Sequence, residues 1–100
     1  MRVQYVQSGG SVGVTKGADL DMARLPAEDA HELRNLVKES GLSVAHTALS
    51  EGSRDLLQHE ITIDDGHHKF SVVLDDGTIP PQAKTLVGYL RRRAHPTPPA

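Results

Sequence analysis

A chain of 100 residues fits one domain, and folding at this length hides roughly two-thirds of the unfolded chain's surface. The formal net charge of −2 gives no broad attraction to nucleic acid or to an anionic membrane, and the absence of cysteine excludes disulfides, thiolate metal sites and thiol nucleophiles. The N-terminal sequence lacks the apolar run of a signal peptide and no stretch approaches ~20 apolar residues, so we expect a cytoplasmic protein that does not enter a membrane.

Residues 1–20 are predicted to form a β-hairpin. Val3 and Tyr5 alternate with polar neighbours, which is the period of a strand with one buried face. A second alternating run starts at Val12 and Val14. Between the two runs, the pair Gly9-Gly10 permits the positive φ angles of a tight turn.

Residues 26–40 are predicted to form a helix. Pro26 suits the first helical position, acidic residues follow in the first turn, and Gly41 is a good C-cap. The apolar stripe of this helix consists of Ala30, Leu33, Leu36 and Val37. Residues 43–54 show only weak periodicity and are interpreted as a connecting loop with at most one short helical turn.

Residues 57–75 are predicted to form a second hairpin, and residues 81–94 a second helix. Asp65-Gly66 is a turn signal between two apolar faces, which carry His59, Ile61 and Ile63 before the turn and Phe70, Val72 and Leu74 after it. Arg91, Arg92 and Arg93 occupy the last turn of the second helix, where cations suit the helix dipole.

These elements predict an α+β fold in the order ββαββα, a four-stranded antiparallel sheet with two amphipathic helices on one face. We expect a single domain over residues 1–94 and a disordered, proline-rich tail over residues 95–100. The residues expected to be mostly buried are Leu33, Leu36, Val37, Ile61, Ile63, Phe70, Val72, Leu86 and Leu90.

The histidines do not have the spacing of a metal site. No two of them stand three to five residues apart, as zinc ligands on one element usually do; they are His31, His46, His59, His67, His68 and His95. His31-Glu32 and His59-Glu60 resemble the start of a zinc-peptidase motif, but the second histidine is missing after each. Carboxylates beside Gly66 and Gly77 fit turns better than a calcium loop. We therefore expect no metal and no cofactor.

Enzymatic chemistry is not apparent elsewhere. Gly9, Gly10 and Gly13 fit neither a P-loop nor a dinucleotide fingerprint, and a strand follows them where a helix is required. No Ser/His/Asp set sits in a recognisable nucleophile turn. The sequence favours a protein-binding module over an enzyme or a small-ligand binder.

From Met1 to about Arg93, the chain resembles the emfourin family, also called protealysin inhibitors. The resemblance rests on the segment Gly9-Gly10-Ser11-Val12-Gly13-Val14, on Leu25-Pro26-Ala27-Glu28-Asp29-Ala30, on Glu60-Ile61-Thr62-Ile63 with Asp65-Gly66, and on the closing helix. It implies an inhibitor of thermolysin-like zinc metallopeptidases that closes the active-site cleft without a cofactor. It also implies an intracellular regulator found alongside its metallopeptidase. Ser11 stands where an aromatic residue is expected, which removes a candidate interface anchor.

The resemblance leads to a hypothesis for the contact with the protease, namely insertion of the first hairpin loop, which comprises Ser8, Gly9, Gly10, Ser11, Val12, Gly13 and Val14. Thermolysin-like enzymes favour an apolar side chain just after the scissile bond, and Val12 or Val14 could fill that pocket. Two alternatives remain open. Both valines could begin the second strand and face the core, and the protein could be a non-inhibitory interaction module with the same fold. If the loop is not the contact, the turn around Gly66 is the next place to search.

Overall fold

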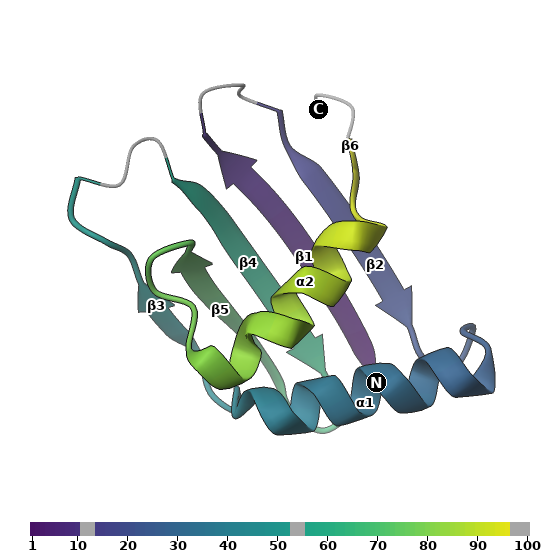
Figure 1. Ribbon diagram of the computed structural model, residues 1–100. Coiled ribbons are helices and arrows are strands. Elements are labelled where there is room, and N and C mark those ends of the chain that lie inside the picture. The colour runs from purple at the N-terminus through teal and green to yellow at the C-terminus, as the bar shows by residue number, and fades with distance from the viewer. Residues whose placement is uncertain (11–13, 53–55, 97–100) are drawn as a thin grey trace.

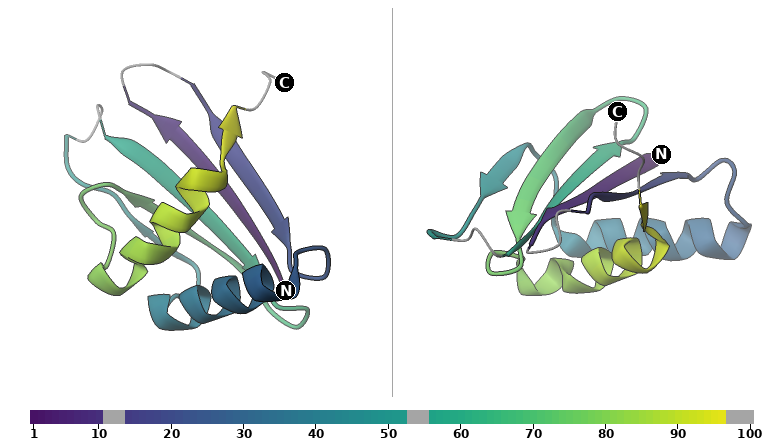
Figure 2. Two further views of the ribbon diagram at one scale, coloured as in Figure 1. Left: turned by 45° about the vertical axis from the view of Figure 1, so that its right-hand side comes forward. Right: turned by 90° about the horizontal axis from the view of Figure 1, so that it is seen from above.

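Figure 1 shows the computed structural model, which describes residues 1–10, 14–52 and 56–96. Within these ranges six strands form one sheet, and they are β1 (Arg2–Gly9), β2 (Lys16–Asp21), β3 (His46–Ala48), β4 (Leu57–Asp64), β5 (Lys69–Asp75) and β6 (His95–Pro96). Two helices, α1 (Ala27–Ser40) and α2 (Lys84–Arg93), lie on the same face of the sheet (Figure 2). A 3-10 turn (Pro81–Ala83) leads into α2.

The predicted four-stranded antiparallel sheet is wrong. Among the residues described, the strand order is β3-β5-β4-β1-β2-β6, and β3 pairs with β5 in parallel, so the sheet is mixed. The strands β1, β2, β4 and β5 do pair antiparallel. β3 and β6 span only three and two residues, which is too short for an alternating pattern to indicate a strand.

The two added strands lie at the two edges of the sheet. β3 falls in the segment that was interpreted as a connecting loop, and β6 falls in the segment assigned to a disordered tail. β6 includes Pro96, which an edge strand tolerates because one side of its backbone needs no ladder partner. Residues 97–100 lie outside the described residues, so the tail and the domain boundary stay predictions.

The ends of the helices follow from their terminal residues. Pro26 precedes α1 in an extended conformation (φ −52°, ψ 147°) and is its N-cap, one position earlier than expected. Gly41 adopts the left-handed conformation (φ 74°) that ends the helix, as predicted. The second helix begins as the 3-10 turn rather than as α-helix at Pro81.

The core lies between the sheet and the two helices. Seven of the nine residues predicted to be mostly buried are buried, namely Leu33, Val37, Ile61, Ile63, Val72, Leu86 and Leu90. Leu36 and Phe70 are only partly buried and pack against the edge of the core. Phe70 lies near the turn between β4 and β5, where the ring of His68 stacks on it with 5.4 Å between ring centroids.

Candidate functional site

Two connections between strands lie at the same end of the sheet (Figure 1). β1 pairs antiparallel with β4 and places Gly9 opposite Leu57, so the end of β1 and the start of β4 are adjacent. β3 runs parallel to β5 and ends opposite Leu74, which brings its following residues to the same end. We call the described residues of these connections the loop end, which comprises Gly9, Gly10, Val14, Thr15, Leu49–Gly52 and Leu56.

Two glycines fix the base of the first connection. Gly9 (φ 85°) and Gly10 (φ 75°) both adopt positive φ angles, which L side chains rarely adopt. A Cβ atom at Gly9 would lie 3.0 Å from the carbonyl oxygen of Leu56, and one at Gly10 would lie 3.1 Å from Cδ2 of Leu57. The backbone of the first connection therefore rests directly on the start of β4, as only glycine permits.

The predicted site residues are only partly within the described chain. Ser8 and Gly9 end β1, Gly10 follows in a turn, and Val14 precedes β2. The side chain of Val14 is 41% exposed, so the alternative in which it faces the core does not hold for this residue. The segment 11–13, which includes Ser11, Val12 and Gly13, lies outside the described residues.

A buried carboxylate holds the second connection. Asp75 is fully buried at the end of β5 and accepts hydrogen bonds from the backbone N–H of Ser50 and from Ser50 Oγ (2.9 Å). The backbone N–H of Gly77 donates to the same carboxylate (2.8 Å), while Thr78 Oγ1 donates to the carbonyl oxygen of Ala48 (2.6 Å). The hydrogen bonds that the Asp75 carboxylate accepts, first the one from the N–H of Ser50, hold the pKa of Asp75 below its usual value.

Leu49 lies directly before Ser50 in this fixed connection. Its side chain is 45% exposed. Because the neighbouring backbone is tied to Asp75 and Thr78, Leu49 is an exposed apolar residue on an ordered base. Such a residue loses little conformational entropy when a partner covers it.

A second network, centred on a buried histidine, lies beneath the loop end. His59 is fully buried, with Nδ1 2.6 Å from the Tyr5 hydroxyl and Nε2 2.7 Å from Oδ1 of Asp76. Burial raises the pKa of Tyr5, so its hydroxyl stays protonated. Asp76 also donates its backbone N–H to the carbonyl oxygen of Leu57 (3.2 Å). The network resembles a catalytic relay in composition, but a fully buried histidine cannot reach a substrate, and its role here is to fasten β5 to β4 and β1.

The remaining histidines are dispersed. His31 lies on α1, His46 on β3, His67 and His68 on the turn after β4, and His95 on β6. In the described parts of the chain, no group of three or more His, Cys, Asp or Glu residues is placed to hold a metal ion. No helix in those same parts is long and apolar enough to cross a bilayer.

Sequence reasoning missed the residues that position the loop end. Tyr5 and His59 were expected on buried faces, but nothing in the pattern paired them with each other or with Asp76. Asp75 is one of the carboxylates beside Gly77, which the sequence pattern indicates only as turn residues. The order Asp75-Asp76-Gly77-Thr78 is the local signal that was available, because Asp and Thr side chains commonly bond to nearby backbone groups.

Comparison with known families identifies the chain. A model of the family described as Emfourin matches residues 5–91. The chain belongs to the Emfourin family. The match runs from within β1 to within α2, so it includes both connections of the loop end. Neither the curated proteins nor the solved structures contain a match.

Membership in the Emfourin family bears on the kind of function. The family is one of protease inhibitors, so membership supports a protease as partner and an inhibitory role over an enzymatic one. The loop end fits such a role in outline, because it offers exposed apolar side chains on a hydrogen-bonded base.

Proposed function

We propose that this Emfourin-family chain inhibits thermolysin-like zinc metallopeptidases and blocks their active-site cleft with its loop end. The observation that carries the proposal is the placement of Val14 and Leu49, two exposed apolar side chains, at the same end of the sheet. Family membership supplies the protease as partner. An enzyme that prefers an apolar side chain beside the scissile bond offers a pocket for one of them.

The base of the loop end supports this proposal physically. Gly9 and Gly10 seat the first connection on β4, and Asp75 ties the second connection through Ser50. A pre-organised loop end loses less entropy on docking than a mobile one, so more of the contact energy remains as affinity. Inhibition by such a surface needs no cofactor, because occupation of the cleft excludes substrate.

Three aspartate substitutions test the proposal. We expect Val14→Asp and Leu49→Asp each to raise the inhibition constant against thermolysin by about tenfold or more, because a charge would replace an apolar contact of roughly 1.4 kcal/mol or more. Val44→Asp is the matched control. Val44 is 64% exposed and precedes β3, so it lies at the opposite end of that strand from Leu49.

The outcomes separate the possible contact surfaces. The circular dichroism spectrum of each variant must match that of the parent chain, so that a change in inhibition reflects binding and not unfolding. If Val14→Asp and Leu49→Asp inhibit as well as the parent does, the loop end is not the contact. A loss of inhibition from His67→Glu instead would place the contact at the turn around Gly66, at the other end of the sheet.

A further inference from the structure

The outer edge of β2 is largely without a partner strand. β6 pairs with β2 only at Lys16 and Gly17. Along Ala18–Asp21 no described strand lies on that side, while the inner side of β2 pairs with β1 over its whole length. An edge strand points alternate N–H and C=O groups outward, where an added strand can bind them.

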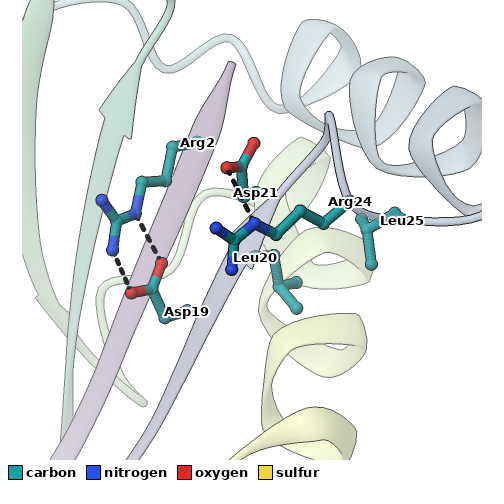
Figure 3. Close-up of a pocket in the computed structure, with 6 residues that line it drawn as sticks. All are labelled: Arg2, Asp19, Leu20, Asp21, Arg24 and Leu25. Atoms are coloured by element: carbon teal, nitrogen blue, oxygen red, sulfur yellow. Dashed lines mark hydrogen bonds and ion pairs between the residues drawn. The ribbon is translucent and has the colours of Figure 1, made fainter.

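Two depressions meet along this edge. One has a volume of about 260 Å³ and is lined by Arg2, Asp19, Leu20, Asp21, Arg24 and Leu25 (Figure 3). The other has a volume of about 420 Å³ and lies between residues 17–20 and the end of α2, with Arg92, Arg93 and His95 along it. Both are lined by Asp19 and Leu20, so they flank the same stretch of β2.

The acidic groups at this edge are already paired. Arg2 forms a two-point ion pair with Asp19, and Nε of Arg24 lies 4.0 Å from Oδ2 of Asp21 (Figure 3). Both aspartates therefore have a cation beside them. Because Asp19 and Asp21 are paired with these two arginines, neither aspartate of β2 neutralises the arginines at the end of α2.

The cationic groups at the end of α2 are available. Arg92 is exposed and makes no hydrogen bond or ion pair with any described residue. The guanidinium carbon of Arg93 lies 3.5 Å from the centre of the Tyr89 ring, and Nη1 donates to the carbonyl oxygen of Tyr89 (3.4 Å). This contact holds Arg93 in place without neutralising its charge. The two depressions together carry four arginines and two aspartates, in a chain whose net charge is −2.

We propose that the outer edge of β2 binds an extended acidic segment of a partner protein as an added strand along Ala18–Asp21. Backbone hydrogen bonds to the edge supply general affinity, and carboxylates placed against Arg92 and Arg93 supply the preference for an acidic sequence. β6 shows that this edge accepts a strand. The site is separate from the loop end and does not depend on protease inhibition.

A peptide titration tests the site. The probe is a capped six-residue peptide of alternating glutamate and valine, which spans the four free residues Ala18–Asp21 with one residue to spare at each end. Added to the ¹⁵N-labelled full chain, it is expected to shift the amide signals of Ala18–Asp21 and of Arg92 and Arg93. Raising the salt concentration from about 50 to 300 mM weakens this binding, because exposed charges are screened. A glutamine–valine peptide of the same length binds at least about threefold more weakly.

Two arginine variants sharpen the test. Arg92→Gln lowers the affinity for the acidic peptide by about three- to fivefold, which is the usual effect of one exposed charge pair. Arg34→Gln removes the same charge from an exposed position on α1 outside both depressions and leaves the affinity unchanged. The proposal is overturned if the shifts fall away from β2, if the glutamine peptide binds equally well, or if sedimentation shows that a second copy of the chain occupies this edge.

Discussion

At the scale of single residues, Asp75 is the group whose chemistry the structure defines most fully. Its pKa is held below the usual value, first by the backbone N–H of Ser50. Since the folded-state pKa lies below the unfolded value of about 3.9, the carboxylate stabilises the fold above about pH 4, and this contribution is lost as the pH falls through the folded-state pKa. Protonation of Asp75 should therefore also weaken the hydrogen bonds that hold the second connection of the loop end.

We expect Asp75→Asn to melt at a lower temperature than the parent at pH 7, with a gap that narrows as the pH falls below about 4. Thermal melts followed by circular dichroism at a series of pH values measure this gap. Glu51→Gln is the control, because Glu51 is exposed in the same connection and should show no such gap. A gap that stays constant down to pH 2 would mean that Asp75 does not act through its charge.

The close approach of Gly9 to Leu56 is tested by substitution with alanine, with Gly52 as the matched control position. Gly9→Ala places a Cβ 3.0 Å from the carbonyl oxygen of Leu56 at a φ of 85°, whereas Gly52→Ala meets no atom within 4 Å at a φ of 67°. Both changes place an L residue in the left-handed conformation, which costs roughly 1–2 kcal/mol of stability. Only Gly9→Ala adds a steric clash. Urea unfolding should show the larger loss of stability for Gly9→Ala. Equal losses would show that the close approach to Leu56 has no energetic effect.

At the scale of elements, the packing of α1 separates two leucines that the sequence treats alike. Leu33 is fully buried in the core, while Leu36 is only partly buried and packs against the core. We expect Leu33→Ala to lower the free energy of unfolding by about 2–5 kcal/mol and Leu36→Ala to lower it by less. Chemical denaturation of the two variants measures the difference. An equal or larger effect of Leu36→Ala would contradict the assigned face of the helix.

The elements that the sequence predicts well are those with a long periodic pattern. Alternation through Ile61 and Ile63 indicates β4, and the stripe of Leu33 and Val37 indicates α1, because burial imposes each period locally. β3 and β6 have no such pattern. They are strands because the edges of β5 and β2 are free to pair with them, and that depends on tertiary structure.

The candidate site shows the same division between local and long-range information. The paired glycines at 9 and 10 predict a turn from the sequence alone. The hydrogen bonds of Asp75 to Ser50 and of His59 to Tyr5 join residues 25 and 54 positions apart, so no local spacing reveals them. Family resemblance, rather than residue chemistry, is what indicated inhibition, because a binding loop needs shape and exposure instead of a fixed set of reactive groups.

At the scale of the whole molecule, the fold separates the stabilising core from the two proposed binding regions. The helices cover one face of the sheet and bury the core, while the loop end and the outer edge of β2 lie at its borders (Figure 2). The loop end is joined to β5 by the hydrogen bonds between Ser50 and Asp75, and Gly9 lies opposite Leu57 of β4. This arrangement suits a small inhibitor, because a stable base presents a contact surface that changes little on binding.

Titration of thermolysin with the purified parent chain tests the central claim most directly. With enzyme well above the inhibition constant, we expect activity on a fluorogenic peptide to fall linearly and to reach its minimum near one chain per enzyme, because each loop end fills one cleft. Full activity at a tenfold excess of chain, with a circular dichroism spectrum showing that the chain is folded, would contradict the proposed inhibition of thermolysin-like metallopeptidases.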